Sequence, residues 1–174
     1  AEGKELIHLK SKRVFKEKTL LELMRTLASL EHLVKGMGRY RLDVAAYFQQ
    51  WDRKKGLPLY FVRMNGQDHF LFDDAELGKF AKQHDLDVEE LEKSGASTTA
   101  HFAELFEASE LAAISKKLAQ WDLSIQEYFP LDSKPAFKLS EEKTSRALGG
   151  LREALIAIEE AGRQGMTIQR YKGL

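Results

Sequence analysis

The chain has 174 residues, of which 43% are hydrophobic and 31% charged, as in a soluble globular protein with one ordinary domain or two small lobes. It contains no cysteine, which excludes disulfides and thiolate metal sites and agrees with the cytoplasmic location that we expect. No apolar run approaches the roughly 20 residues of a membrane span, and no signal-peptide pattern opens the chain, so we expect no membrane partner.

Charge is distributed unevenly, although 27 basic and 27 acidic residues cancel overall. Residues 1–58 contain 13 Lys and Arg against 7 Asp and Glu, residues 59–133 contain 6 against 15, and residues 134–174 contain 8 against 5. A basic first third allows one face to meet a polyanion while the acidic middle repels it. The alternative is that these charges average out in three dimensions.

The first 18 residues are polar and basic, and a short strand or an ordered arm fits them equally well. Long cationic side chains neutralise phosphates without reading sequence, so this stretch is a candidate nucleic-acid contact. A helix follows, because Thr19 and Glu22 have capping-box spacing and apolar residues then recur at steps of three and four. Gly36 and Gly38 are expected to end it.

A second helix is predicted from Val44 through an aromatic-rich face that reaches Trp51, with Gly56 and Pro58 as its stop signals and a basic cluster at its C-terminal end. The cluster is a further candidate for phosphate contact, and its alternative role is to interact favourably with the helix dipole. A helix-turn-helix DNA-binding motif is disfavoured, because the second helix has few polar residues placed to contact base edges.

A β-hairpin is predicted from Leu59–Met64 and Gln67–Phe72, joined by the turn dipeptide Asn65-Gly66. Asp73 then caps a helix that ends near His84, and Asp87 caps a short helix that ends near Gly95. The acidic run 85–90 also suggests a magnesium site, since carboxylates bind this ion. The cap is favoured, because the run follows the polar end of a helix. We would expect a magnesium-binding pair of carboxylates to follow a buried apolar strand instead.

The remaining elements follow from similar patterns. We expect a loop at 94–99, a strand or the start of a helix at 101–106, a helix at 111–121, and a short helical turn capped by Ser124 with Glu127. A second hairpin is expected from 136–139 and 144–148, then a helix from Gly149-Gly150 to Gly165, and last a strand at 167–171. The fold class is therefore α+β, with several amphipathic helices and small antiparallel hairpins, divisible into lobes 1–95 and 96–165.

Residues 166–174 contain a specific hexapeptide: Gln169, Arg170, Tyr171, Lys172, Gly173 and Leu174. It resembles the start of the motif that leads from the metal-binding TOPRIM domain towards the tail region in DNA gyrase B subunits. In that family the run continues through Gly-Glu-Met-Asn-Pro. Residues 1–165 resemble, in length, position and pattern, the long insertion that some bacterial B subunits carry before this motif. Topoisomerase IV shares the hexapeptide, but its B subunit usually lacks so long an insertion.

The resemblance implies a parent enzyme that introduces negative supercoils into DNA at the expense of ATP, with Mg²⁺ bound by TOPRIM carboxylates. Those carboxylates and the ATPase lobe are not expected in this chain, which shows no Walker loop and no nucleophile elbow. Its five histidines have no metal-ligand spacing. We therefore expect a segment without catalytic residues, metal site or cofactor of its own.

The partners implied by the resemblance are duplex DNA and the gyrase A subunit, and the segment would help to couple ATP use to strand passage. The basic residues that we take as DNA-contact candidates are Lys10, Lys12, Arg13, Lys16, Arg53, Lys54 and Lys55. The alternative is a protein-interaction or spacer module that touches no nucleic acid. The sequence pI of about 7.2 favours that alternative, since dedicated DNA-binding domains tend to be basic.

Overall fold

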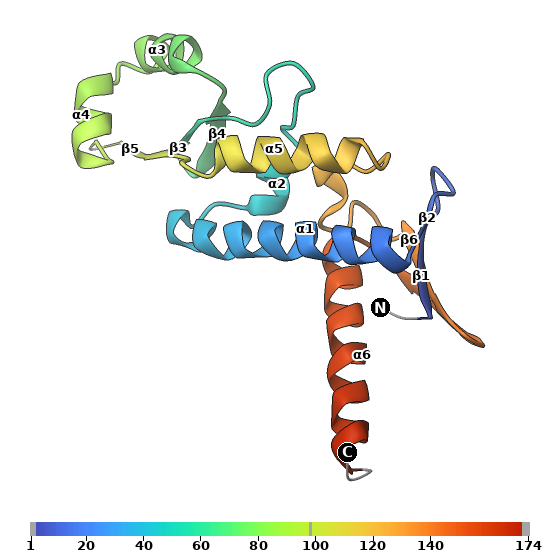
Figure 1. Cartoon of the computed structure of the whole chain (residues 1–174). Coiled ribbons are helices and arrows are strands. Elements are labelled where there is room, and N and C mark those ends of the chain that lie inside the picture. Colours follow the sequence, from blue (N-terminus) through green and yellow to red (C-terminus); the bar gives the residue numbers. More distant parts are fainter. Residues whose placement is uncertain (1–2, 98, 172–174) are drawn as a thin grey trace. The chain divides into compact units, whose positions relative to one another are not determined.

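The structure is a computed structural model that describes residues 3–97 and 99–171, with side chains described up to Arg163. In these residues the chain forms α-helices and two small antiparallel sheets, which confirms the α+β class (Figure 1). The helices are α1 (Glu17–Gly36), α2 (Val44–Phe48), α3 (Asp74–Gln83), α4 (Val88–Ser94), α5 (Ala108–Ala119) and α6 (Leu151–Tyr171), with 3-10 turns η1 (Met37–Tyr40) and η2 (Ile125–Glu127). The strands are β1 (Lys4–His8), β2 (Val14–Lys16), β3 (Tyr60–Met64), β4 (Gln67–Leu71), β5 (Ala100–Glu104), β6 (Phe137–Glu141) and β7 (Thr144–Leu148).

The chain divides into two compact units. Unit 1 comprises Ala1–His32 and Lys117–Leu174, and unit 2 comprises Leu33–Lys116. Unit 1 is discontinuous because β1 pairs antiparallel with β6 in the sheet β2-β1-β6-β7, which places Leu6 opposite Leu139. This division differs from the predicted lobes 1–95 and 96–165, because pairing between such distant strands leaves no local signal in the sequence.

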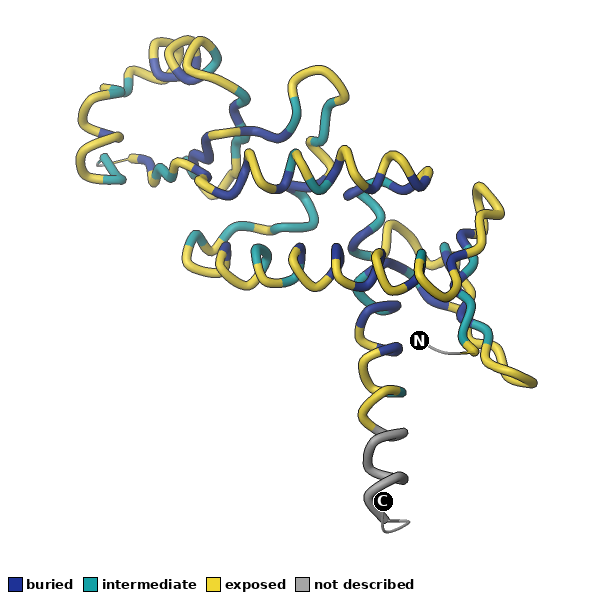
Figure 2. The backbone as a smooth tube through the Cα atoms, viewed as in Figure 1, coloured by how far each residue is buried: buried dark blue, intermediate teal, exposed yellow. Residues whose placement is uncertain are grey.

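Unit 1 buries one face of its sheet, as the alternation of a half-buried strand requires. Leu6 of β1 and Phe137 of β6 are fully buried, and Figure 2 shows buried stripes along α1 and α6. The buried residues of α6 are Leu151, Ala154, Leu155, Ala157 and Ile158. Their spacing of three and four residues is that of one helix face. The predicted capping box at Thr19 and Glu22 lies inside α1, which begins at Glu17.

Unit 2 contains the sheet β4-β3-β5 and follows the local signals closely. Asn65 and Gly66 have φ values of 54° and 74°, as the tight turn of the predicted hairpin requires. The Asp73 carboxylate accepts the Glu76 N–H at 2.8 Å at the start of α3. Helix α2 ends at Phe48, before the predicted Trp51. One face of the sheet buries Tyr60, Val62, Leu71 and Ala100 with Leu77, Phe80 and Leu91 of α3 and α4.

The end of the chain differs from the prediction. Helix α6 continues to Tyr171, so Gly165 lies inside it and the predicted strand 167–171 is wrong. Helical hydrogen bonds close within one turn, whereas a strand depends on a neighbouring strand. A glycine inside a helix costs only about 1 kcal/mol, so it need not end one. Lys172, Gly173 and Leu174 lie outside the described residues.

Candidate nucleic-acid interface

A tight turn between β1 and β2 presents the first group of predicted cations. The Lys12 N–H donates to the His8 carbonyl at 2.7 Å, and the His8 N–H donates to the Arg13 carbonyl at 2.9 Å. Lys12 has a φ of 63°, a left-handed conformation that reverses the chain. The side chains of Lys10, Lys12 and Arg13 are exposed, as is that of Lys16 on β2. The structure thus brings these four candidates together on one hairpin.

A buried histidine holds this turn in place. His8 is 2% exposed, and its Nε2 donates to the Glu127 carboxylate at 2.7 Å. Its Nδ1 lies 2.7 Å from the Ser11 hydroxyl, which also accepts the Arg13 N–H at 3.2 Å. With the proton on Nε2, Ser11 donates to Nδ1 and every group is satisfied. Because Glu127 also caps η2 through the Ser124 N–H at 3.0 Å, the basic turn is fixed to the body of unit 1.

The cations of this turn are largely uncompensated. Arg13 lies 3.3 Å from Asp122, and both side chains are exposed at 41% and 63%. An exposed ion pair of this kind contributes about 0–1 kcal/mol, so Arg13 can exchange its partner for a phosphate. Among the described residues, no carboxylate pairs with Lys10, Lys12 or Lys16. The turn therefore offers a positive surface to solvent.

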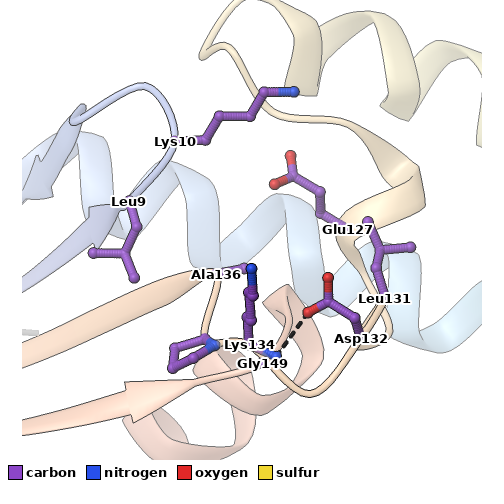
Figure 3. A pocket seen from close by; sticks show the side chains of 9 residues that line it. Leu9, Lys10, Glu127, Leu131, Asp132, Lys134, Ala136 and Gly149 are labelled. Carbon is purple, nitrogen blue, oxygen red and sulfur yellow. Dashed lines mark hydrogen bonds between the residues drawn. The ribbon is translucent and has the colours of Figure 1, made fainter.

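A cavity of about 470 Å³ lies beside the turn (Figure 3). Lys10 and Lys134 line it together with Glu127 and Asp132, and the Asp132 carboxylate accepts the Lys134 N–H at 2.7 Å. Two cations and two carboxylates balance, so the cavity has no preference for an anion. The positive character is a property of the turn itself.

The second group of candidates, residues 53–55, lies in unit 2 on a turn closed by mutual backbone bonds of 2.8 Å between Asp52 and Gly56. The Asp52 carboxylate accepts two backbone N–H groups of the turn, which lower its pKa. Lys55 pairs with Glu76 at 3.5 Å. The helix-dipole interpretation of this cluster is wrong, because α2 ends at Phe48 and the dipole acts only within the last turn.

The helix that contains the start of the C-terminal hexapeptide is anchored in unit 1. Arg152 of α6 donates through Nε and Nη2 to the Glu31 carboxylate at 3.1–3.2 Å. The same carboxylate accepts the hydroxyl of Tyr128, which is fully buried, at 2.6 Å. Burial and this hydrogen bond raise the pKa of Tyr128. The first half of α6 is therefore held rigidly on α1, while Gln169, Arg170 and Tyr171 form its end.

Asp87 in the acidic run 85–90 caps helix α4, as predicted. The Asp87 side chain accepts the Glu89 N–H at 3.0 Å at the start of α4. Within residues 3–97 and 99–171, no cluster of three or more histidine or acidic side chains has the arrangement of a metal site. None of the helices in that part of the chain is long and apolar enough to cross a membrane.

Sequence reasoning missed the clamp formed by His8 and Glu127, because 119 residues separate the two. The only available signal was the capping box at Ser124 and Glu127, which was predicted and is confirmed. The division into units reduces the charge contrast that the sequence segments show, but unit 1 stays net positive and unit 2 net negative. Unit 1 contains 16 Lys and Arg against 13 Asp and Glu, and unit 2 contains 11 against 14.

No family model, curated protein or solved structure matches this chain.

Proposed function

We propose that this chain is a non-catalytic segment of a DNA gyrase B subunit, inserted before the motif that begins at Gln169. On this proposal its unit 1 contacts the phosphate backbone of duplex DNA through the β1–β2 turn. The observation that carries the proposal is the hexapeptide 169–174, whose resemblance is specific and whose first three residues form the end of a helix anchored in unit 1. The segment would also contact the A subunit, and the parent enzyme would supply the ATPase lobe and the magnesium site.

The architecture of unit 1 supports a coupling role. The basic turn belongs to β1, which pairs with β6, and β6 pairs with β7. Only Gly149 and Gly150 separate β7 from α6. Hydrogen-bonded strands therefore connect the turn to the helix that carries the motif. This is what a DNA-sensing element needs if it is to influence strand passage.

The chemistry of the turn favours binding without sequence preference. Lysine side chains act as flexible point charges, and phosphate contacts release counterions from DNA. We expect affinity that falls steeply with salt and changes little with DNA sequence.

A protein-docking role is the second candidate, and one observation favours it. Phe106 of unit 2 is 69% exposed, whereas the other phenylalanines of the described sheet and helices are mostly buried. An exposed aromatic side chain is a frequent anchor of protein interfaces. On this reading unit 2 would meet a protein such as the A subunit, with no requirement for DNA.

Duplex DNA binding by the 174-residue chain tests the proposal. Lys10, Lys12 and Arg13 are replaced together by Gln, and Lys79, Lys82 and Lys93 form the matched control, since these three are exposed and lie in unit 2. Each lost phosphate contact lowers the slope of log K against log salt by about 0.9. We expect the hairpin variant to lose about 2–3 in slope and at least tenfold in affinity at 0.1 M salt.

The control variant removes the same charge and should keep the slope of the wild-type chain. Equal losses in both variants mean that net charge alone binds DNA and the turn has no special role. No loss in the hairpin variant removes the DNA assignment and leaves the docking role as the better account.

A further inference from the structure

A second basic site lies in unit 2, in a cavity of about 400 Å³ that the sequence did not indicate. Its polar lining comes from η1 and from two neighbouring strands: Arg39, Tyr40, Arg41, Arg63 and His101. Phe61 supplies aromatic surface, whereas the side chain of Phe102, which lies opposite Val62, packs on the core face of the sheet. Three arginines, a histidine and a tyrosine thus converge within the unit that carries the net negative charge.

Strand register explains why these side chains meet. Phe61 and Arg63 are two residues apart on β3, so they project from the same face. On β5 their direct neighbours are Ala103 and His101. The opposite face is occupied by the core with α3 and α4. Arg63 and His101 therefore lie on the face opposite that core, where Phe61 packs against Phe70.

Two of the arginines are held in fixed orientations. Arg63 donates to both oxygens of Asp68 at 2.7 and 3.1 Å and to the Arg41 carbonyl at 3.0 Å. Arg39 pairs with Glu107 at 2.6 Å and lies over the Tyr40 ring at 4.3 Å. A guanidinium carries five N–H groups, and in the described residues Nη1 of Arg63 and Nε of Arg39 have no acceptor. These donors are oriented and unused.

The other two basic groups have no counter-ion. Among the described residues, neither Arg41 nor His101 forms an ion pair or a side-chain hydrogen bond, and both side chains are exposed. Arg41 has a φ of 57°, and its N–H donates to the Gly38 carbonyl. A non-glycine residue seldom adopts this conformation, which here places the Arg41 side chain in the cavity wall.

Glu107 stabilises the arrangement without cancelling it. Its carboxylate, 10% exposed, accepts Arg39 Nη1 and also the Tyr40 hydroxyl at 2.9 Å. Burial opposes ionisation, but these hydrogen bonds outweigh it and lower the pKa of Glu107. With Asp68 and Glu107 neutralising Arg63 and Arg39, the charge of Arg41 remains uncompensated and is available to a ligand.

We propose that this cavity binds one phosphate group of a DNA backbone, with Arg41 and His101 as the contacting side chains. Arginine and histidine donors suit phosphate oxygens, and the fixed N–H groups of Arg39 and Arg63 add directional bonds. The neighbouring cavity of unit 2 is lined by Asp74, Glu92 and Glu104, so a polyanion is attracted at one end of the sheet and repelled at the other. The identity of the polymer rests on the proposed function, whereas phosphate binding does not.

Two variants of the 174-residue chain test the site with duplex DNA as probe. Arg41→Gln with His101→Gln removes the two contacts, and Arg41→Lys keeps a positive charge. One lost phosphate contact should lower the salt slope by about 0.9 and the affinity at 0.1 M salt about eightfold. The Lys variant should keep the slope, because a point charge still neutralises a phosphate. Lys79→Gln with Lys82→Gln is the matched control and should bind as the wild type does.

Pyrophosphate provides a second probe that involves no DNA. We expect the ring signals of His101 in NMR spectra to shift on titration with pyrophosphate, and to stay constant in chloride at equal ionic strength. If those signals do not move and the Gln variant binds DNA with unchanged slope, the site is refuted. If the His101 signals shift but DNA affinity is unchanged in both the cavity and hairpin variants, the phosphate site stands and the DNA proposal fails.

Discussion

Removal of the Glu31 carboxylate is the sharpest perturbation of the anchor that holds α6. The Glu31 side chain is 14% exposed and serves both the buried Tyr128 hydroxyl and the Arg152 guanidinium. In Glu31→Ala the hydroxyl loses its acceptor inside the core, which costs about 1–3 kcal/mol. The lost ion pair adds only about 0–1 kcal/mol, because Arg152 is 42% exposed and water screens it.

The expected loss for Glu31→Ala is therefore about 1–4 kcal/mol, or roughly 2–16 °C in Tm for a chain of this size. Glu31→Gln keeps an acceptor for Tyr128 and should lose only about 1 kcal/mol. Glu22→Ala is the control, since Glu22 lies on the same helix with an exposed side chain, and it should change stability by less than about 0.5 kcal/mol.

Urea unfolding followed by circular dichroism measures these differences. The order of stability should be wild type and the Glu22 variant first, then Glu31→Gln, then Glu31→Ala. If Glu31→Ala unfolds at the same urea concentration as Glu22→Ala, the carboxylate does not anchor α6 on α1, and that part of the account is refuted.

Three further predictions follow from the same structure. Lys12→Gly should stabilise the chain by about 0.5–1 kcal/mol, because glycine adopts a φ of 63° without strain. The same variant should still lower DNA affinity. Urea unfolding measures the change in stability, and fluorescence anisotropy measures the change in DNA affinity. Gly150→Ala would place a Cβ 2.8 Å from the Tyr128 carbonyl oxygen and should cost about 1–3 kcal/mol, whereas Gly162→Ala meets no atom within 4 Å and should gain about 0.5–1 kcal/mol in the same assay. The lowered pKa of Glu107 means that its contribution to stability is present above the ordinary value near 4.5 and is lost as pH falls through the folded-state pKa; Glu107→Gln should flatten that acid dependence, and an unchanged pH profile would contradict it.

The features predicted correctly were those with local physical causes. Asn65-Gly66 requires positive φ values that few other pairs adopt, and Asp73 and Asp87 satisfy N–H groups within three residues of themselves. The capping box at Ser124 and Glu127 belongs to the same class. Such signals fix the ends of elements, so most helices and the hairpins β3–β4 and β6–β7 were expected where the structure has them.

The features missed depend on distant residues. The pairing of β1 with β6 reassigns both ends of the chain to one unit, and the clamp between His8 and Glu127 spans the same gap. The predicted strand at 167–171 failed because β propensity is weak without a neighbouring strand. The cavity around Arg41 was missed since strand register brings its residues together from a basic and an acidic part of the sequence.

DNA supercoiling by a reconstituted gyrase tests the central proposal most directly. The B subunit would carry this segment with Lys10, Lys12 and Arg13 replaced by Gln, beside a control with Lys79, Lys82 and Lys93 replaced in the same way. We predict that the hairpin variant hydrolyses ATP without DNA at the normal rate but supercoils plasmid DNA at least tenfold more slowly, while the control supercoils normally. Normal supercoiling by the hairpin variant across a salt series would contradict the proposal that this turn holds DNA.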